Sequence, residues 1–326
     1  MKCILAIDSG GTKCDALLVR NDGAAIGWGH CGFRDPESGR GRRGSGRSEE
    51  SVTLAVKKAI GDIQCDELHF ISFGIQIPPA LTESLAESRV ELHLIREYDA
   101  ALALAGLEWG LVALAGTGAF AYGKTSDGRT LWLDGLGPML GDYGSGYQIG
   151  HQAIRAAARS GWHPRHETSL AEVVPEACMA NYAKPSRFSL VEYMLDTRDR
   201  AEIASLARLV DTEANKGDRI SRQIIEEAAA SMAETIRDLV DRLGIANEDY
   251  TLVGTGSVAT RSRIYWDSLC GIVAEFAPRL KPVQAEAPLA AGMVLAVLPQ
   301  LEAECSPETF HRNLLDSIAH ISEVQT

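Results

Sequence analysis

The hydrophobic pattern of the chain repeats itself. Residues 2–29 (KCILAIDSGGTKCDALLVRNDGAAIGWG) contain an apolar run, a small Gly/Thr turn, a second apolar run, an Asp-Gly turn and a third run. Residues 110–135 (GLVALAGTGAFAYGKTSDGRTLWLDG) have the same order of features. Each segment is typical of three short strands joined by tight turns. Two copies of one strand–turn–strand–turn–strand unit indicate a duplicated fold with two similar lobes.

Outside the repeats, continuous apolar runs alternate with segments of helical periodicity, an order that predicts an α/β fold. The chain turns mainly helical after residue 147. The predicted strands cover 3–7, 14–19, 24–28, 69–75, 91–95, 111–115, 119–122, 130–133 and 251–253. The predicted helices cover 48–63, 82–88, 99–107, 147–160, 167–180, 188–196, 200–215, 218–243, 260–277, 288–298 and 308–321.

Composition narrows the class of protein. The chain has 326 residues, enough for two domain cores, and 45% of them are hydrophobic. The net charge of −12 argues against nucleic acid or an anionic membrane as the main partner. Seven scattered cysteines without a C-x-x-C pair favour reduced thiols. With no apolar run of membrane-spanning length and a strand where a signal peptide would lie, we expect a cytoplasmic protein.

The first glycine turn, DSGGTK at residues 8–13, lies between two predicted strands. It lacks the spacing of a Walker A motif and does not open a helix. Gly10 and Gly11 would leave backbone N–H groups free to approach a phosphate, and Thr12 could hydrogen-bond its oxygens. Asp8 could hold hydrated Mg²⁺. The alternative is a plain hairpin, because D-x-G-G is also common turn chemistry.

The second repeat carries its own glycine turn, Gly116-Thr117-Gly118. Either turn alone could be a hairpin and nothing more. Two such turns in a duplicated fold could share the β- and γ-phosphates of ATP, since positioning and charge stabilisation are most of what phosphoryl transfer requires. The pair therefore predicts an ATP site.

Two carboxylates are candidates for the chemistry of an acceptor. Asp99 follows a predicted strand and opens an Ala-rich helix, where it is either a helix N-cap or a general base that takes the proton from an attacking hydroxyl. Asp142 lies in GLGPMLGDYGSGYQIG at residues 135–150, which has six glycines. It could accept hydrogen bonds from sugar hydroxyls, or the segment could be an unusually Gly-rich loop.

Three further features of the sequence give weaker functional signals. LVGTGS at 252–257 could pass its backbone beneath an adenine or ribose, or it could be a plain strand-to-helix turn. ESGRGRRGSGR at 37–47 reads as a flexible loop, with a mobile lid as the alternative. The eight histidines show no zinc-ligand spacing, and we expect them at the surface.

The motifs DSGGTKCDALLV, REYDAALALAG, LAGTGAFAYG, GLGPMLGDYGSGYQIG, LVGTGSVA and PLAAGMVLAVL occur in the order found in a known family. Nearly the whole chain resembles the BadF/BadG/BcrA/BcrD ATPase family, most closely its N-acetylglucosamine kinase branch. The resemblance implies a two-lobed, actin-like (ribonuclease H-like) fold with an ATP and sugar cleft between the lobes. It places one lobe at 1–116, joined by a returning C-terminal helix at about 305–322, and the other at 117–304 with helical insertions.

The same resemblance implies the activity and the residues that carry it. The activity is ATP-dependent phosphorylation of an amino sugar, usually at the 6-hydroxyl, with Mg²⁺. Asp99 would be the base and would also bind the sugar. The remaining residues fall into three implied groups: phosphate contacts at Gly10, Gly11, Thr12, Lys13, Gly116, Thr117 and Gly118; adenosine contacts at Ala204, Gly254, Thr255, Gly256 and Ser257; and a sugar pocket at Gly135, Leu136, Gly137 and Asp142.

The chain departs from the family pattern at three points. Tyr143 stands where the family often has a carboxylate, Leu136 replaces a common tryptophan, and residues 32–47 lack the asparagine that kinases often place on the sugar. Glucosamine or another hexose derivative therefore stays open as the substrate. Two other functions stay open: an ATPase activator of a radical dehydratase, and a nucleotide-sensing actin-like protein without a sugar. Homodimer formation is also left open.

Overall fold

The computed structural model describes residues 1–32, 49–83, 85–178, 189–196 and 200–323. These residues form two compact units, Met1–Glu108 with Ala285–Thr326, and Trp109–Gln284. From the sequence, the boundary between the lobes was predicted at 116/117, and only the last helix was expected to belong to the first lobe. The units divide instead near residues 108 and 285, so that the Ala-rich helix expected at 288–298 belongs to unit 1. The Arg/Gly-rich segment 37–47 lies outside the described residues.

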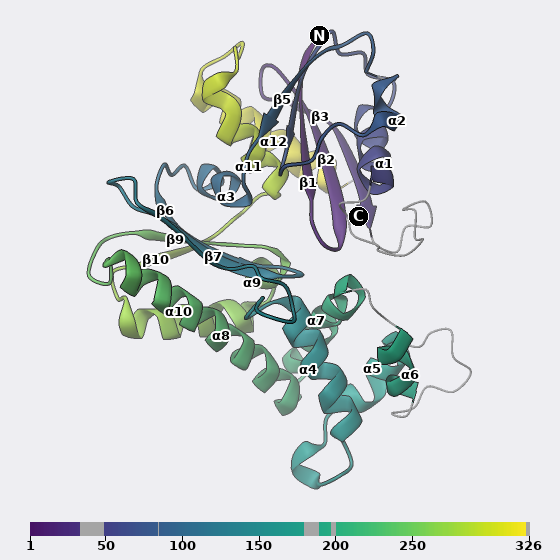
Figure 1. The fold of residues 1–326 in the computed structure, drawn as a ribbon, viewed down its shortest axis with the longest axis vertical. Coiled ribbons are helices and arrows are strands. Elements are labelled where there is room, and N and C mark those ends of the chain that lie inside the picture. The colour runs from purple at the N-terminus through teal and green to yellow at the C-terminus, as the bar shows by residue number, and fades with distance from the viewer. Residues whose placement is uncertain (33–48, 84, 179–188, 197–199, 324–326) are drawn as a thin grey trace. The chain divides into compact units, whose positions relative to one another are not determined.

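Unit 1 is a five-stranded mixed sheet with helices on both faces (Figure 1). The strand order is β3-β2-β1-β4-β5, in which β1, β2 and β3 are antiparallel neighbours and β1, β4 and β5 are parallel. Its elements are β1 (Lys2–Ser9), β2 (Lys13–Arg20), β3 (Ala25–Gly32), α1 (Glu49–Ile60), β4 (Glu67–Ser72), α2 (Pro79–Thr82), β5 (Arg89–Leu94), α3 (Glu97–Leu104), α11 (Leu289–Val297), η2 (Leu298–Gln300) and α12 (Pro307–Glu323).

Alternation along β1 explains the two faces of this sheet. Leu5 and its alternate neighbours pack into a core with the apolar side of α1, whereas Ile4 and Ala6 pack into a second core with α11 and α12. Successive side chains of a strand point to opposite faces, so a strand buried on both sides is apolar at every position. On the second face α11 approaches α3 closely, because a Cβ at Gly292 would lie 2.2 Å from the carbonyl oxygen of Ala100.

Unit 2 repeats the topology of unit 1. Its strand order is β10-β9-β6-β7-β8, with β6, β7 and β8 antiparallel and β6, β9 and β10 parallel. Its elements are β6 (Gly110–Ala115), β7 (Ala119–Lys124), β8 (Thr130–Asp134), α4 (Gly146–Arg159), η1 (Pro164–His166), α5 (Leu170–Cys178), α6 (Ser189–Asp196), α7 (Arg200–Asn215), α8 (Arg219–Leu243), β9 (Thr251–Thr255), α9 (Ser257–Arg261), α10 (Arg263–Phe276) and β10 (Lys281–Gln284).

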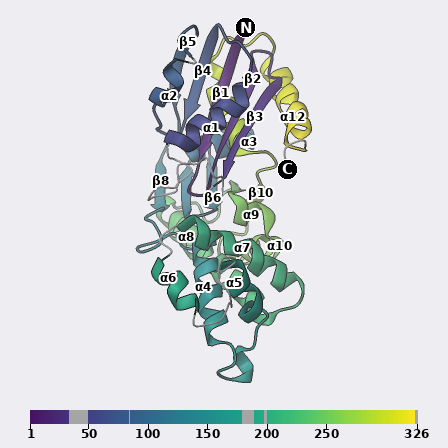
Figure 2. The same ribbon diagram turned by 90° about the vertical axis from the view of Figure 1, so that its right-hand side faces the viewer.

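Each unit is thus an antiparallel three-strand meander extended by two parallel strands from its first strand. The predicted duplicated α/β fold is confirmed. In unit 2, α4, α7, α8 and α10 gather on one side of the sheet (Figures 1 and 2) and share one large core. None of the helices within the described ranges combines the length and apolar character needed to cross a bilayer.

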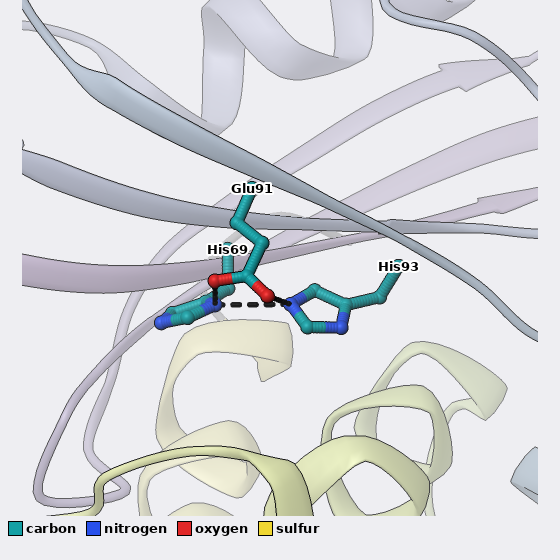
Figure 3. Close-up of side chains that lie close together, drawn as sticks. All are labelled: His69, Glu91 and His93. Carbon is teal, nitrogen blue, oxygen red and sulfur yellow. Dashed lines mark hydrogen bonds and ion pairs between the residues drawn. The ribbon is translucent and has the colours of Figure 1, made fainter.

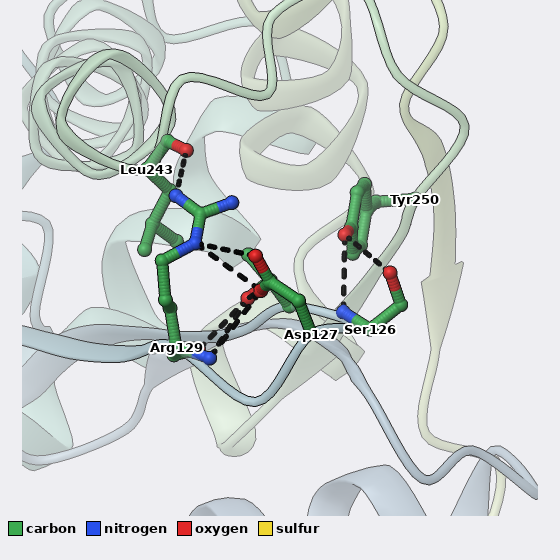
Figure 4. Close-up of polar contacts among 6 residues, drawn as sticks. Ser126, Asp127, Arg129, Leu243 and Tyr250 are labelled. Atoms are coloured by element: carbon green, nitrogen blue, oxygen red, sulfur yellow. Dashed lines mark hydrogen bonds and ion pairs between the residues drawn. The ribbon is translucent and has the colours of Figure 1, made fainter.

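The Asp-Gly turn of the second repeat is tied to the rest of unit 2 (Figure 4). Arg129 connects the turn to α8. Its Nε pairs with the carboxylate of Asp127 in the turn at 2.9 Å, and its Nη1 donates to the carbonyl oxygen of Leu243 in α8 at 2.7 Å. The backbone N–H of Ser126 donates to the hydroxyl of Tyr250 at 3.2 Å. These contacts fix the β7–β8 turn against the end of α8 and the start of β9.

The observed elements differ from the predicted ones at several places. The helix predicted over 260–277 is two helices, because Ser262 ends α9 and caps α10 by accepting from the N–H of Tyr265 at 3.3 Å. The strand β10 was not predicted; all four of its residues are exposed, so no hydrophobic alternation marks it. The short helix α2 covers Pro79–Thr82 rather than 82–88, since proline is favoured in the first turn of a helix.

Candidate functional site

The first glycine turn joins β1 to β2 in unit 1. Its closing hydrogen bond runs from the N–H of Gly10 to the carbonyl oxygen of Lys13 at 2.9 Å. Gly10, Gly11 and Thr12 are all partly exposed, so their backbone can be reached from solvent. The turn follows the carboxyl end of β1, the edge of a parallel sheet where ligands bind in α/β folds. The phosphate role of this turn stays a prediction.

A buried carboxylate on β2 lies behind this turn. Asp15 pairs through one oxygen with the ammonium of Lys13 and through Oδ1 with Nδ1 of His30 at 2.6 Å. Burial works to raise the pKa of Asp15, but the contacts with His30 and Lys13 outweigh it and hold the pKa below its usual range. Lys13, predicted as a phosphate contact, is therefore already engaged by a carboxylate.

Neither Asp15 nor His30 was among the site residues predicted from the sequence. The available signal was a lone acidic residue inside the otherwise apolar run of β2. Asp15 lies directly opposite His30 on β3 and directly opposite Asp8 on β1. Asp8, the predicted Mg²⁺ ligand, is therefore on the same face of the sheet as a carboxylate that already contacts Lys13 and His30.

Asp99 is the third residue of α3, which begins at Glu97 and not at Asp99 as predicted. The N–H of Arg96, the N-cap residue, donates to Oδ2 of Asp99 at 3.2 Å. This contact satisfies one of the backbone donors at the start of the helix. Because β1, β4 and β5 are parallel, α3 follows the same edge of the sheet at which the Gly10–Thr12 turn lies. The general-base role of Asp99 stays a prediction.

The second glycine turn, in unit 2, is held by the start of α4. The N–H of Gly146 donates to the carbonyl oxygen of Gly116 at 2.7 Å, and the N–H of Tyr147 donates to that of Thr117 at 3.2 Å. The turn itself closes through the N–H of Gly116 and the carbonyl oxygen of Gly118 at 2.9 Å. The Gly-rich segment and the phosphate turn, predicted separately, are therefore one structural feature.

Residues predicted to contact the adenosine converge on this same turn. A Cβ at Gly146 would lie 2.9 Å from the carbonyl oxygen of Gly116 and 3.3 Å from that of Ala204 on α7. Gly256 has φ of 86°, and a Cβ there would lie 2.5 Å from the carbonyl oxygen of Ala115, the residue before the turn. Such close backbone approach needs glycine, and it brings the turn, α7 and the start of α9 together.

The other residues of the predicted adenosine turn have different surroundings. Ser257 is the first residue of α9, and Thr255 is a buried residue at the end of β9. Gly254 is a strand residue, and a Cβ there would lie 2.2 Å from the ring of Trp266. Close packing against this indole accounts for the glycine at 254; its predicted contact with adenosine stays a prediction.

The loop between β8 and α4 is built around Asp134, which the sequence analysis did not single out. Its Oδ1 accepts from the N–H of Asp142 and its Oδ2 from the N–H of Tyr143, both at 2.7 Å. Asp134 and Asp142 have φ of 68° and 58°, a left-handed conformation that is uncommon outside glycine but tolerated by Asp. One side chain thus fixes the far end of the loop to its start.

Asp142 is 4% exposed, and its carboxylate lies against the second glycine turn. A Cβ at Gly118 would lie 2.9 Å from its Oδ2. Oδ1 accepts from the N–H of Gly137 at 3.3 Å, and the backbone N–H of Ala119 also interacts with the carboxylate, whereas Oδ2 has no hydrogen bond of normal geometry among the described residues. Burial raises the pKa of Asp142 above its usual range, opposed in part by nearby backbone N–H groups. An unsatisfied buried acceptor of this kind suits a hydroxyl donor from a ligand.

The other residues predicted to form a sugar pocket lie on the same loop. Gly135 and Gly137 have φ of 76° and 82°, and Leu136 is exposed between them. The structure therefore brings the predicted sugar residues of unit 2 next to Gly118, while Asp99 belongs to unit 1.

The histidine prediction is wrong at two positions. His69 on β4 and His93 on β5 are largely buried, not at the surface. They lie 24 residues apart in the sequence and come together because β4 and β5 are neighbours in the sheet. No local spacing rule could have found this pair.

Comparisons with known proteins concern the family and the fold of the chain. A family model described as BadF/BadG/BcrA/BcrD ATPase family matches residues 5–279. The N-acetylmuramic acid/N-acetylglucosamine kinase of Clostridium acetobutylicum is 31% identical over 202 residues, which make up 60% of this chain and 64% of that protein. The N-acetyl-D-glucosamine kinase of Dictyostelium discoideum is 26% identical over 316 residues, 90% of this chain and 97% of that protein. The match therefore spans less than two thirds of the first relative and nearly all of the second.

Among solved structures, a candidate N-acetylglucosamine kinase from Chromobacterium violaceum is similar to this protein with a TM-score of 0.63. The sequence identity is 18%, and the match covers 91% of this chain and 99% of that one. At this level of identity the likeness shows a shared fold.

Proposed function

The chain belongs to the BadF/BadG/BcrA/BcrD ATPase family, and from that premise we propose that it is an ATP-dependent kinase of an amino sugar. N-Acetylglucosamine is the first candidate substrate and glucosamine the second, with the 6-hydroxyl as the acceptor. Two relatives that act on N-acetylglucosamine support this choice. A cytoplasmic location, where ATP is abundant, is part of the proposal.

The observation that carries the proposal is the contact between the Asp142 carboxylate and Gly118. A phosphate-binding turn beside a buried, partly unsatisfied carboxylate suits a site where a hydroxylated acceptor meets a phosphate donor. Asp142 would accept hydrogen bonds from sugar hydroxyls, and the backbone of Gly116–Gly118 would bind phosphate oxygens. Ala204 and Gly256, which adjoin the same turn, would contact the adenosine.

Asp99 would act as the general base. A carboxylate suffices for this task, because the acceptor proton is transferred as the phosphoryl group moves and needs only a well-placed oxygen. The Asp99 side chain is partly exposed, so its carboxylate can be reached from solvent, and Oδ2 accepts from the N–H of Arg96.

Mg²⁺ fits the donor set of unit 1. Asp8 offers a carboxylate oxygen at the end of β1, and oxygen donors are what this ion prefers. When bound, Mg²⁺ neutralises charge on the triphosphate. Asp8 would hold the ion, and Gly10–Thr12 would position phosphate oxygens beside it. That one nucleotide is held by the turns of both units stays a prediction.

The test is ADP release by the full-length chain with Mg²⁺ and ATP over a panel of sugars. The panel contains N-acetylglucosamine, glucosamine, N-acetylmuramic acid and glucose, with a no-sugar control. We expect ADP release that saturates with an amino sugar and stays near background without one. The site of phosphorylation is then read from the product by NMR. ADP release that no sugar stimulates would overturn the kinase proposal and favour the ATPase-activator or nucleotide-sensing function.

A further inference from the structure

Three potential metal ligands meet on one face of the unit 1 sheet (Figure 3). In the parallel register of β4 and β5, His69 lies opposite Glu91, and Ile71 lies opposite His93. Because side chains alternate along a strand, His69, Glu91 and His93 all point to the face on which Ile71 joins the core beneath α11 and α12. The cluster is at the outer edge of that core, where β5 is the last strand of the sheet.

The donor atoms lie at distances typical of one coordination sphere. Nδ1 of His69 is 3.0 Å from Nε2 of His93, and these atoms are 3.6 and 3.8 Å from the nearer carboxylate oxygens of Glu91. Ligands about 2.0–2.2 Å from a tetrahedral zinc ion lie about 3.3–3.6 Å from one another. One nitrogen of each histidine and one oxygen of Glu91 all lie within 4.8 Å of one another, so small side-chain shifts would bring them to three corners of a tetrahedron, with a fourth corner left for water or another ligand.

A hydrogen bond between the two imidazoles does not account for Glu91. One proton shared at 3.0 Å satisfies Nδ1 of His69 and Nε2 of His93, yet the carboxylate directs one oxygen at each of these nitrogens from beyond hydrogen-bond distance. Figure 3 shows the second nitrogen of each ring pointing away from the cluster. A cation among the three groups would use all the inward-facing donors at once.

Burial and hydrogen bonding also suit a metal site. The side chains of His69 and His93 are 11% and 8% exposed, whereas that of Glu91 is 65% exposed, so an ion can enter from the Glu91 side. A side-chain hydrogen bond links His93 to Gln300 of η2, an outer contact of the type that orients metal-binding histidines.

We propose that His69, Glu91 and His93 form a binding site for one divalent ion of the zinc class, distinct from the proposed phosphoryl-transfer residues. Two imidazoles and one carboxylate are ligands that Zn²⁺ takes in proteins. The ion would join the edge strand β5 to β4. Since β5 ends five residues before Asp99, the site would also hold the segment that leads to α3.

The experiment uses full-length protein stripped with a chelator and titrated with Zn²⁺ in a calorimeter, with thermal unfolding measured in parallel. Wild type is compared with His93→Gln, Glu91→Gln and the control Glu87→Gln, which removes an exposed carboxylate just before β5. We expect one tight ion in wild type and Glu87→Gln, and a rise in Tm when it binds. We expect Glu91→Gln to bind Zn²⁺ at least about tenfold more weakly than wild type, and His93→Gln to lose the tightly bound ion.

Cobalt substitution separates this site from binding by cysteines. Co²⁺ held by imidazole and carboxylate gives only weak visible bands, whereas thiolate ligands add an intense band in the near ultraviolet. If His93→Gln fails to fold, Glu91→Gln decides the matter, because Glu91 is mostly exposed. Equal Zn²⁺ affinity in wild type and Glu91→Gln, no tight ion in wild type, or a thiolate spectrum would overturn the proposal.

Discussion

The carboxylate of Asp134 accepts a hydrogen bond from the backbone N–H of Asp142, eight positions further along the chain, at 2.7 Å and thereby closes the loop between them. Both residues have positive φ, so neither end of the loop rests in an ordinary extended or helical conformation. The contact is also what turns the Asp142 side chain back toward Gly118. Asp134 is therefore a positioning residue for the proposed sugar site.

Replacing Asp134 with Asn tests this positioning role. The amide keeps one acceptor but presents an N–H to one of the two backbone donors, so we expect about 1–3 kcal/mol lower free energy of unfolding. We also expect a higher sugar KM with a smaller change in ATP KM. Asp238→Asn, an exposed change on α8, is the matched control. A sugar KM that stays at the wild-type value would show that Asp134 does not set the geometry of the site.

Truncation at Asp142 tests the sugar contact itself. Asp142→Ala removes the buried acceptor, and we expect the sugar KM to rise roughly tenfold to a hundredfold, more than the ATP KM. Steady-state kinetics with each substrate varied in turn give the two values. The reverse ranking would mean that Asp142 serves the phosphate turn through Gly118 rather than the sugar.

The base role of Asp99 predicts a different kinetic pattern. Asp99→Asn keeps an acceptor for the N–H of Arg96, so we expect the start of α3 to stay intact. We expect kcat to fall about 100-fold or more while the Kd for ATP changes little. ATP binding is measured by calorimetry, and turnover by ADP release with saturating sugar. Turnover near the wild-type rate would remove Asp99 from the base role.

The contacts of the buried Asp15 carboxylate with His30 and Lys13 predict that the stability of the fold depends on pH. The pKa of Asp15 is lower in the folded protein than its usual value of 3.8. The ion pair therefore stabilises the fold fully above about pH 4–5, and this contribution is lost as pH falls through the folded-state pKa. We expect Asp15→Asn to cost about 1–3 kcal/mol at pH 7 and progressively less below pH 4.

Urea unfolding of wild type and Asp15→Asn between pH 3 and pH 7 gives this difference directly. Asp62→Asn, an exposed change in the turn after α1, is the control and should leave the pH profile unchanged. A wild-type-minus-variant difference that is the same at every pH would show that the charge of Asp15 contributes nothing.

The duplicated sheets could be predicted because each repeat is a local meander. Turns such as Gly10–Thr12 and Gly116–Gly118 are short, and the strands beside them contain continuous apolar runs. The strand β10 escaped prediction because it pairs in parallel with β9 and all four of its residues are exposed. A hydrophobic pattern in the sequence indicates buried positions, and β10 has no buried position that could produce such a pattern.

The candidate site residues likewise divide into those that have a local signal in the sequence and those that have none. Asp142 was proposed because a carboxylate among glycines stands out, and Ala204 was proposed by resemblance to a family; both roles stay predictions. Asp134 and His30 were missed because their roles depend on contacts with residues 8 and 15 positions away, which only the folded loop and the β2–β3 pairing create. Each is an ordinary polar residue in its own segment, so the chain gives no local sign of its importance.

The face of the first sheet that carries Ile4 and Ala6 is covered by α11 and α12, which lie nearly three hundred residues further along the chain. On the ribosome, the strands made first therefore keep this apolar face incompletely covered until α11 and α12 have been translated. The unit made second is continuous and can complete its own core before then. The order in which the two halves mature is thus the reverse of the order in which they begin to be translated.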